Sequence, residues 1–414
     1  MARSTWMLVF LCLGALLSVP AGSHSSELPT SDQASPPQPT PPETETPAAA
    51  SSPPSAVVRS DLRGNRPAVP PQGLPSEGGF TLFEIHDAQA RGAVCNSGEP
   101  ARYHVRPGTG ARSDHWLLFF KGGGACWTDD DCDERWRTQH QLMRTAGTPQ
   151  LRTDGLFSND PTKNPDFHDW NVVFVWSCSS DQWMGDRAAS DATGGFHFRG
   201  ARIVDTLIDD LLHRPVTGMS SPRGAAVLMV GGASAGTGAV RAHGNEIASK
   251  IGAKKTFFLH DSGIEPFLTE GFRTVIDNVN RARHAYWNAQ PNDACMAAAN
   301  DPVRCMENIH VLTHHMAHPV FANMDQLDGK ATKRQQVARG SSAEANLSKG
   351  IRDFLASDTF AGAYSIRRRG HTLVTKDTFF DVSARSLDGQ RMSMAHTLAN
   401  LVYDRGGPTK AMSK

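Results

Sequence analysis

The pentapeptide Gly232-Ala233-Ser234-Ala235-Gly236 is the feature that most constrains this chain, because the apolar run Ala225–Val230 comes just before it. Such a run is typical of a buried parallel strand. A serine on the sharp turn from strand to helix keeps its hydroxyl exposed, and small flanking residues let the two backbones approach. An ordinary glycine-rich turn can carry the same letters, but the position after a strand favours Ser234 as a nucleophile.

Three further apolar runs end in small or polar residues in the same way, and a helical pattern lies between two of the strands. In that segment, Ala201–Leu212, apolar residues recur at helical spacing with aspartates on the other side. This rhythm predicts an α/β fold of the α/β-hydrolase type, with a mainly parallel sheet and helices on both faces. The three runs are His115–Phe120, Trp170–Trp176 and Thr256–Leu259.

A second glycine-rich segment, Gly122-Gly123-Gly124, follows the first of these runs. In this architecture, amides from such a loop and from the residue after the nucleophile bind the oxyanion. We therefore predict an oxyanion hole formed by Gly123, Gly124 and Ala235. A phosphate-binding loop is the alternative, but no Gly-Lys-Ser/Thr follows the glycines.

The acid and the base of such a site follow the serine in the chain, in the order aspartate or glutamate, then histidine. Of the many histidines beyond Ser234, His371 lies where a late loop could return over the nucleophile. Asp325 and Asp328 follow a short predicted strand at 318–321 and are candidates for the acid. Asp261 also ends a strand and competes with them.

The chain divides into three parts by composition. Residues 1–25 have the basic tip, short apolar run and small residues of a signal peptide. Residues 26–76 are rich in Pro, Ser and Thr, and this composition predicts a disordered stalk. We expect residues 77–414 to form one esterase domain. The apolar run is shorter than the ~20 residues that span a bilayer, so we expect a secreted protein, or a periplasmic one in a bacterium. A retained membrane anchor is the alternative.

Six cysteines remain once the signal peptide is excluded, and an even set in an exported protein predicts three disulfides. Local proximity favours Cys126–Cys132 and Cys295–Cys305, which leaves Cys95–Cys178. A zinc site is the alternative, but no cysteine pair has the C-x-x-C spacing typical of structural zinc.

Charge and ligand patterns restrict the function classes. Acidic and basic residues balance at 42 each and form no basic stripe, so we expect no nucleic-acid partner. No cofactor is implied. His315 and His318 suggest a metal site, but no carboxylate stands at ligand spacing, and we predict no metal. Asn346-Leu347-Ser348 is an N-glycosylation acceptor pattern.

Four aromatic residues stand near the predicted active-site loops: Trp127, Trp176, Trp183 and Phe196. Each could line an apolar pocket, stack on a sugar ring or cap the core.

Taken together, these residues resemble the pectin acetylesterase family, which includes Notum-type carboxylesterases that remove a lipid from Wnt proteins. The resemblance runs in order through most of the predicted domain. The matching segments are Leu117–Cys126, Cys132, Asn164–Phe167, Trp170-Asn171, Cys178, Phe198–Gly200, Gly232–Gly236, Asp261–Gly263, and His371 with Asp377–Phe379.

The resemblance implies Ser234 as the nucleophile and His371 as the general base. The family's acid lies nine residues after a proline, which leads from Pro319 to Asp328. Asp325 stays the alternative, and Asp261 becomes a structural residue.

Two positions depart from the family pattern. Lys121 stands where the family usually has glutamate, and Gly370 replaces a cysteine that often precedes the histidine.

The expected activity is hydrolysis of O-acyl esters, with an acetyl or other short acyl group favoured and a polysaccharide as one possible carrier. A long-chain acyl esterase or protein-lipid deacylase is the alternative. An inactive homologue that binds carbohydrate or lipid is a further one.

Overall fold

The computed structural model describes residues 74–75, 77–145, 151, 153–214, 219–264, 266 and 270–413. The predicted signal peptide, 1–25, and most of the predicted stalk, 26–76, lie outside these residues. Leu74–Pro75 is a short strand, β1, paired with Thr81–Glu84, so the sheet begins inside the range that we predicted as stalk.

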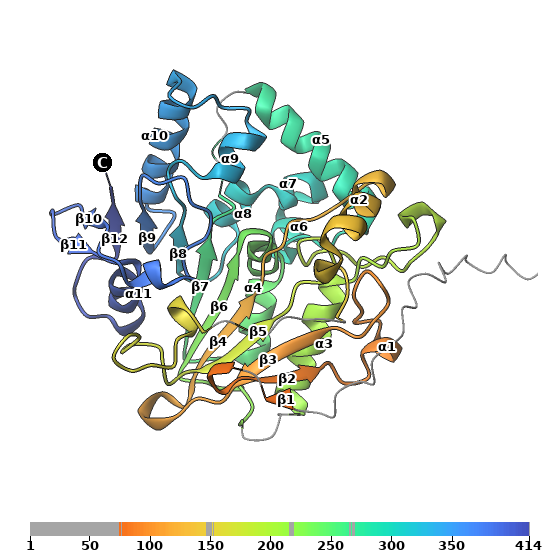
Figure 1. The fold of residues 1–414 in the computed structure, drawn as a ribbon, viewed down its shortest axis with the longest axis horizontal. Coiled ribbons are helices and arrows are strands. Elements are labelled where there is room, and N and C mark those ends of the chain that lie inside the picture. Colours follow the sequence, from red (N-terminus) through yellow and green to blue (C-terminus); the bar gives the residue numbers. More distant parts are fainter. Residues whose placement is uncertain are drawn as a thin grey trace, which may run out of the picture. The chain divides into compact units, whose positions relative to one another are not determined.

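A twelve-stranded sheet organises the described residues in the order β1-β2-β3-β5-β4-β6-β7-β8-β9-β12-β10-β11 (Figure 1). Its centre, from β5 to β12, is parallel, and both edges are antiparallel. The predicted α/β class with a mainly parallel sheet is confirmed. The remaining strands are β2 Thr81–Glu84, β3 Arg102–Arg106, β4 His115–Phe120, β5 Asn171–Val175, β6 Val227–Ala233, β7 Lys255–Asp261, β8 Val320–Asn323, β9 Gly362–Ser365, β10 Ala384–Ser386, β11 Arg391–Met392 and β12 Lys410–Met412.

Helices connect the parallel strands, and α2, α5, α7, α8 and α9 lie beyond their carboxyl ends (Figure 1). The helix predicted at 201–212 is α3, with Ile203, Leu207 and Leu211 buried. Within the described ranges, no helix combines the length and apolarity that a membrane span needs. The helices are α1 Ala88–Arg91, α2 Asp129–Gln139, α3 Gly200–His213, α4 Thr237–Ile251, α5 Glu270–Trp287, α6 Asp293–Ala299, α7 Pro302–Met306, α8 Asn308–His314, α9 Gly329–Arg334, α10 Ser342–Ala356 and α11 Met394–Tyr403.

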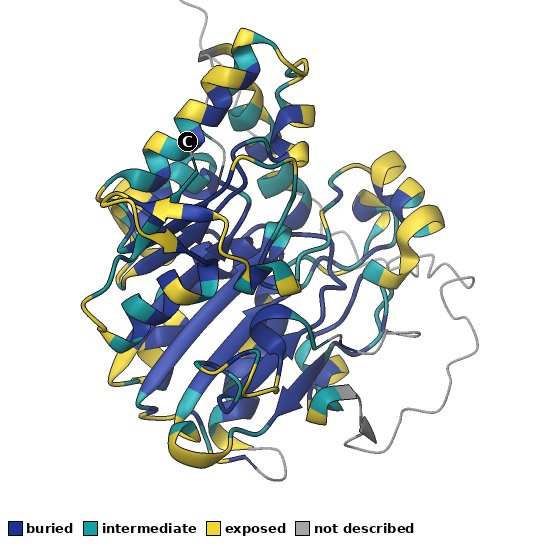
Figure 2. Ribbon diagram, turned by 60° about the vertical axis from the view of Figure 1, so that its left-hand side comes forward, coloured by how far each residue is buried: buried dark blue, intermediate teal, exposed yellow. Residues whose placement is uncertain are grey.

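The central strands are covered on both faces. Every residue of β5, β6, β8 and β9 is buried (Figure 2). Successive side chains of a strand point to opposite faces, so a fully buried strand has packing partners on each side. This is why β5 and the first part of β6 read as continuous apolar runs instead of alternating patterns.

The six cysteines of the described chain form the three disulfides expected from the sequence: Cys95–Cys178, Cys126–Cys132 and Cys295–Cys305. The second closes a small ring directly after the glycine loop, and the third joins α6 to α7.

The turn after β6 is tight enough to require its glycines. A Cβ atom on Gly232 would lie 2.3 Å from the carbonyl oxygen of Gly236. A Cβ atom on Gly236 would lie 2.0 Å from the carbonyl oxygen of Phe120, the last residue of β4. The turn at Ser234 and the end of β4 are therefore in direct backbone contact.

We expect Gly236→Ala to lower the free energy of unfolding by about 1–3 kcal/mol, because its methyl group has no space. Gly350→Ala, within α10, is the matched control. Its added Cβ atom would make an ordinary contact, 3.6 Å from Pro266. This change should stabilise by about 0.5–1 kcal/mol through helix propensity. Urea denaturation measures both, and a Gly236→Ala protein as stable as the wild type would contradict the tight turn.

Candidate active site

Ser234 lies at the carboxyl end of β6, on a short 3-10 turn that leads into α4. Its φ is 54°, in the left-handed region that few non-glycine residues adopt. The Thr237 hydroxyl donates a hydrogen bond to the Ser234 carbonyl oxygen at 2.6 Å, which closes the turn. Strained backbone of this kind is the geometry expected of a nucleophile turn.

His371 comes from the loop after β9 and links Ser234 to Asp328. Its Nε2 lies 2.7 Å from Ser234 Oγ, and its Nδ1 lies 2.7 Å from Asp328 Oδ2. In the tautomer that suits both contacts, Nδ1–H donates to the carboxylate and Nε2 accepts the serine O–H. Such an arrangement can move a proton from the serine to the imidazole.

Asp328 is fully buried and is held by the helix that it begins. As the N-cap of α9, its Oδ1 accepts hydrogen bonds from the amides of Lys330, at 2.8 Å, and Ala331, at 3.2 Å. These bonds fix one carboxylate oxygen to the backbone. The other oxygen is thereby aimed at His371.

Asp325, the alternative acid, faces another partner. Its Oδ2 accepts a hydrogen bond from Arg368 Nε at 3.0 Å, and no bond joins it to His371 in the part of the chain described. Burial raises the pKa of Asp325 to about 6, partly opposed by Arg368. A Cβ atom on Gly370 would lie 2.0 Å from Asp325 Oδ2. The ion pair therefore occupies the space where a side chain at position 370 would stand.

Asp261, the third candidate, supports the loop of His371. Its Oδ2 accepts hydrogen bonds from the amides of Leu373, at 2.8 Å, and Val374, at 3.0 Å. Ser262 Oγ accepts a bond from the amide of Thr372 at 3.0 Å. Burial raises the pKa of Asp261, and these amides oppose the rise.

The glycine loop is anchored through its carbonyl side. Arg135 Nη2 of α2 donates to the Gly123 carbonyl oxygen at 2.6 Å. Within the described residues, the amides of Gly123 and Gly124 donate no hydrogen bond. They are therefore free to bind a substrate oxygen.

Lys121, which departs from the family pattern, lies beside this loop. Its Nζ is 4.6 Å from the centre of the Trp176 ring. Burial, with a smaller effect from Arg135, lowers the pKa of Lys121 to about 8. The position thus holds a weakly basic amine packed on an aromatic ring.

A cavity of about 440 Å³ opens beside Ser234 and His371, and Gly124 and Ala235 also line it. One wall is apolar and consists of four residues of α5 at spacings i, i+3, i+4 and i+7: Phe272, Val275, Ile276 and Val279. Sequence reasoning missed this wall, although the helical spacing was there to be read.

The cavity also contains arginines. Arg241, Arg283 and Arg334 all line it. Arg241 is buried, where its Nη1 donates to Thr237 Oγ1 at 3.0 Å, and burial lowers its pKa to about 10. Among the residues described, no carboxylate forms an ion pair with Arg241 or Arg283. The cavity therefore carries positive charge next to its apolar wall.

Of the four aromatic residues singled out in the sequence, only Trp127 lines this cavity, with the Arg283 guanidinium 4.1 Å from its ring centre. Trp176, Trp183 and Phe196 are buried in the core.

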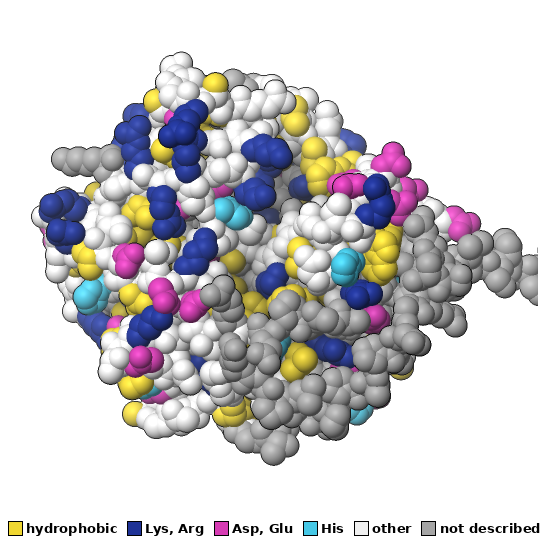
Figure 3. Space-filling model, viewed as in Figure 1, with side chains coloured by type: hydrophobic (Ala, Val, Ile, Leu, Met, Phe, Trp, Pro, Cys, Tyr) yellow, Lys and Arg dark blue, Asp and Glu magenta, His cyan; other side chains and the backbone are white. Residues whose placement is uncertain are grey.

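Lys and Arg side chains gather around the α9–α10 side of the face in Figure 3, whereas Asp and Glu gather at α2. The balanced total charge thus hides an uneven distribution.

Known proteins resemble this chain in sequence and in fold. The family model for Pectinacetylesterase matches residues 76–407. The human palmitoleoyl-protein carboxylesterase NOTUM is 34% identical over 170 residues, 41% of this chain and 32% of that protein. Pectin acetylesterase 11 of Arabidopsis thaliana is 32% identical over 167 residues, 40% of this chain and 41% of that protein. The chain thus spans less than half the length of these relatives.

The structure of the Wnt deacylase Notum from Drosophila superimposes with a TM-score of 0.67 at 20% identity, covering 80% of this chain and 95% of that chain. The fold is therefore α/β-hydrolase-like, with a serine, a histidine and an aspartate joined at the ends of its parallel strands. Because the family model covers well over half of the sequence, the chain belongs to the Pectinacetylesterase family.

We expect Asp328→Asn to lower kcat for an ester substrate by about 10³- to 10⁴-fold, because the amide no longer fixes the reactive tautomer of His371. Asp325→Asn should lower kcat less than about tenfold and act mainly on stability, since Asp325 contacts Arg368. Steady-state kinetics and melting temperatures of both variants test this. The opposite order of kcat losses would assign the acid to Asp325.

Proposed function

We propose that this chain is a serine carboxylesterase that hydrolyses O-acyl esters through Ser234, His371 and Asp328. The observation that carries the proposal is the unbroken chain of hydrogen bonds from Ser234 Oγ through the imidazole to the buried Asp328 carboxylate. Membership of a family with esterase relatives supports it.

The reaction is acyl transfer in two halves. His371 takes the hydroxyl proton of Ser234 while Oγ attacks the ester carbonyl carbon, and the amides of Gly123, Gly124 and Ala235 bind the resulting oxyanion. The alcohol leaves with the proton from His371. Water then attacks the acyl-serine with the same base and releases the carboxylic acid.

We favour an acetyl or other short acyl ester on an anionic carrier such as an acidic polysaccharide. A cavity of about 440 Å³ is far larger than an acetyl group, so most of it is available to the carrier. Arg241 and Arg283 have no ion-pair partner in the described chain and could pair with carboxylates of such a carrier.

A long-chain acyl ester is the second candidate, and the apolar wall of α5 favours it. Val275 of this wall is 53% exposed and stands beside Phe272, Ile276 and Val279 in the cavity lining. The same wall could pack against an acyl chain.

Export is part of the proposal. Three disulfides are typical of proteins that fold outside the reducing cytosol. The predicted signal peptide at 1–25 would direct it there.

We expect Ser234→Ala to lower kcat/KM for p-nitrophenyl acetate by about 10⁴-fold or more and to abolish labelling by a fluorophosphonate probe. Ser249→Ala is the matched control, because Ser249 is exposed on α4. It should react like the wild type. No turnover and no labelling of the folded wild type would contradict the esterase and favour the inactive binding homologue.

The carrier is tested with acetylated uronic-acid oligosaccharides beside acetylated neutral ones. Arg283→Gln should raise KM about tenfold for the acidic substrate alone, because a charge-assisted hydrogen bond is lost. Arg281→Gln, exposed on the same helix, is the matched control and should change neither. If p-nitrophenyl octanoate instead has the higher kcat/KM and Arg283→Gln has no effect, the long-chain alternative is correct.

A further inference from the structure

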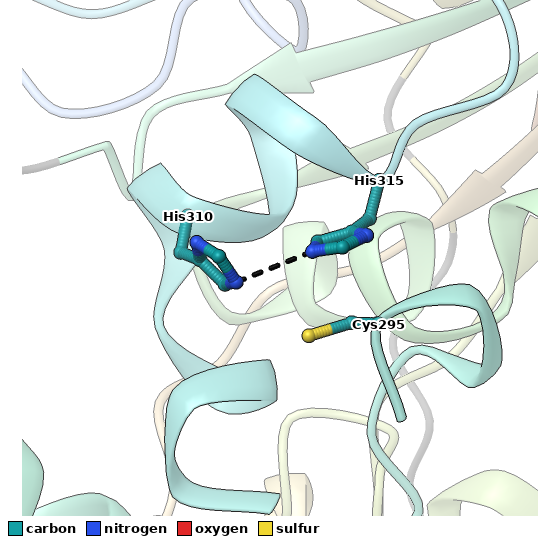
Figure 4. Close-up of side chains that lie close together, drawn as sticks. All are labelled: Cys295, His310 and His315. Carbon is teal, nitrogen blue, oxygen red and sulfur yellow. Dashed lines mark hydrogen bonds between the residues drawn. The ribbon is translucent and has the colours of Figure 1, made fainter. Parts of the chain in front are cut away.

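Two histidines away from the candidate active site face each other at the surface. His310 belongs to α8, and His315 follows directly after it. Their Nε2 atoms are 3.2 Å apart (Figure 4). His318, which the sequence suggested as the partner of His315, instead packs edge-on against Phe258 at 5.6 Å between ring centres.

The separation of the two nitrogens matches a shared metal ligand set. Two imidazoles bound to one tetrahedral Zn²⁺ at about 2.0–2.1 Å each have nitrogens about 3.3–3.4 Å apart. Without an ion, one imidazole must donate to the other. With an ion, both lone pairs are used.

The surroundings hold this pair in place. Asn245 of α4 donates through Nδ2 to the His315 carbonyl oxygen at 2.7 Å, and its Oδ1 accepts from the amide of Ala317 at 2.9 Å. The Sγ atom of Cys295 lies within 4.8 Å of the imidazole nitrogens and points toward the pair (Figure 4). It is bonded to Cys305 and so is not a thiolate.

The nearest cations are partly neutralised. Arg273 and Arg304 both form ion pairs with the buried carboxylate of Glu307. Both imidazoles are partly exposed to solvent.

We propose that His310 and His315 bind one divalent transition-metal ion of the Cu²⁺ and Zn²⁺ class, with water completing the coordination. Imidazole ligands select these ions over Mg²⁺ and Ca²⁺, which require oxygen ligands. This site is separate from the proposed catalytic residues and does not depend on the esterase activity.

The ion would fasten His310, inside α8, to His315, which follows directly after the helix. Asn308, the first residue of α8, lines the cavity together with Met306 and Glu307. A bound ion would therefore stiffen α8, whose first residue lines the cavity, and raise the melting temperature.

The test uses the full chain with intact disulfides and no polyhistidine tag. Titration with Cu²⁺ should give one site, and its electron paramagnetic resonance spectrum should show coupling to two imidazole nitrogens. His310→Asn and His315→Asn should each weaken binding about 10- to 100-fold and abolish the Zn²⁺-dependent rise in melting temperature.

His318→Asn is the matched control and should bind as the wild type does. Mg²⁺ and Ca²⁺ should produce no shift in melting temperature. Equal Cu²⁺ affinity of the wild type, His310→Asn and His315→Asn would overturn the proposal. A Cu²⁺ spectrum of the wild type that shows coupling to one nitrogen or to none would also overturn it. This measurement does not depend on whether any variant folds.

Discussion

The loop that carries His371 is held by a carboxylate that takes no part in the proposed reaction. Asp261 ends β7, is fully buried, and accepts hydrogen bonds from the amides of Leu373 and Val374, just beyond the histidine. The loop has little regular structure of its own, so these bonds help to hold His371 beside Ser234. The placement of His371 therefore depends in part on a neighbouring strand.

Much of the central sheet was readable from the sequence, because β4, β5, β6 and β7 are almost wholly buried and therefore appear as apolar runs, whereas β9, Gly-Ala-Tyr-Ser, carries no such signal. The turn at Ser234 was readable for a related reason: Gly232 and Gly236 have no space for a side chain. The partner of His371 was not readable, because Asp325 and Asp328 stand at the two ends of one hydrogen-bonded turn and only tertiary contacts tell them apart. The pairing of His315 with His310 likewise depends on how α8 ends.

Two departures from the family pattern have local physical explanations. At Gly370, the ion pair of Asp325 and Arg368 fills the space beside the chain, so a side chain has no place there. At Lys121, the amine packs on Trp176, and burial makes it a weaker base than an exposed lysine. Each change is accommodated next to the candidate site without displacing Ser234, His371 or Asp328.

The backbone contact between the Gly236 turn and the end of β4 joins Ser234 and the glycine loop into one frame. The α5 wall of the cavity belongs to a different segment, with no share in that frame. The apolar part of the cavity wall and the groups of the proposed reaction therefore lie in separate stretches of sequence. Substitutions at Phe272, Val275, Ile276 or Val279 would reshape that wall while Ser234, His371 and Asp328 stay where they are.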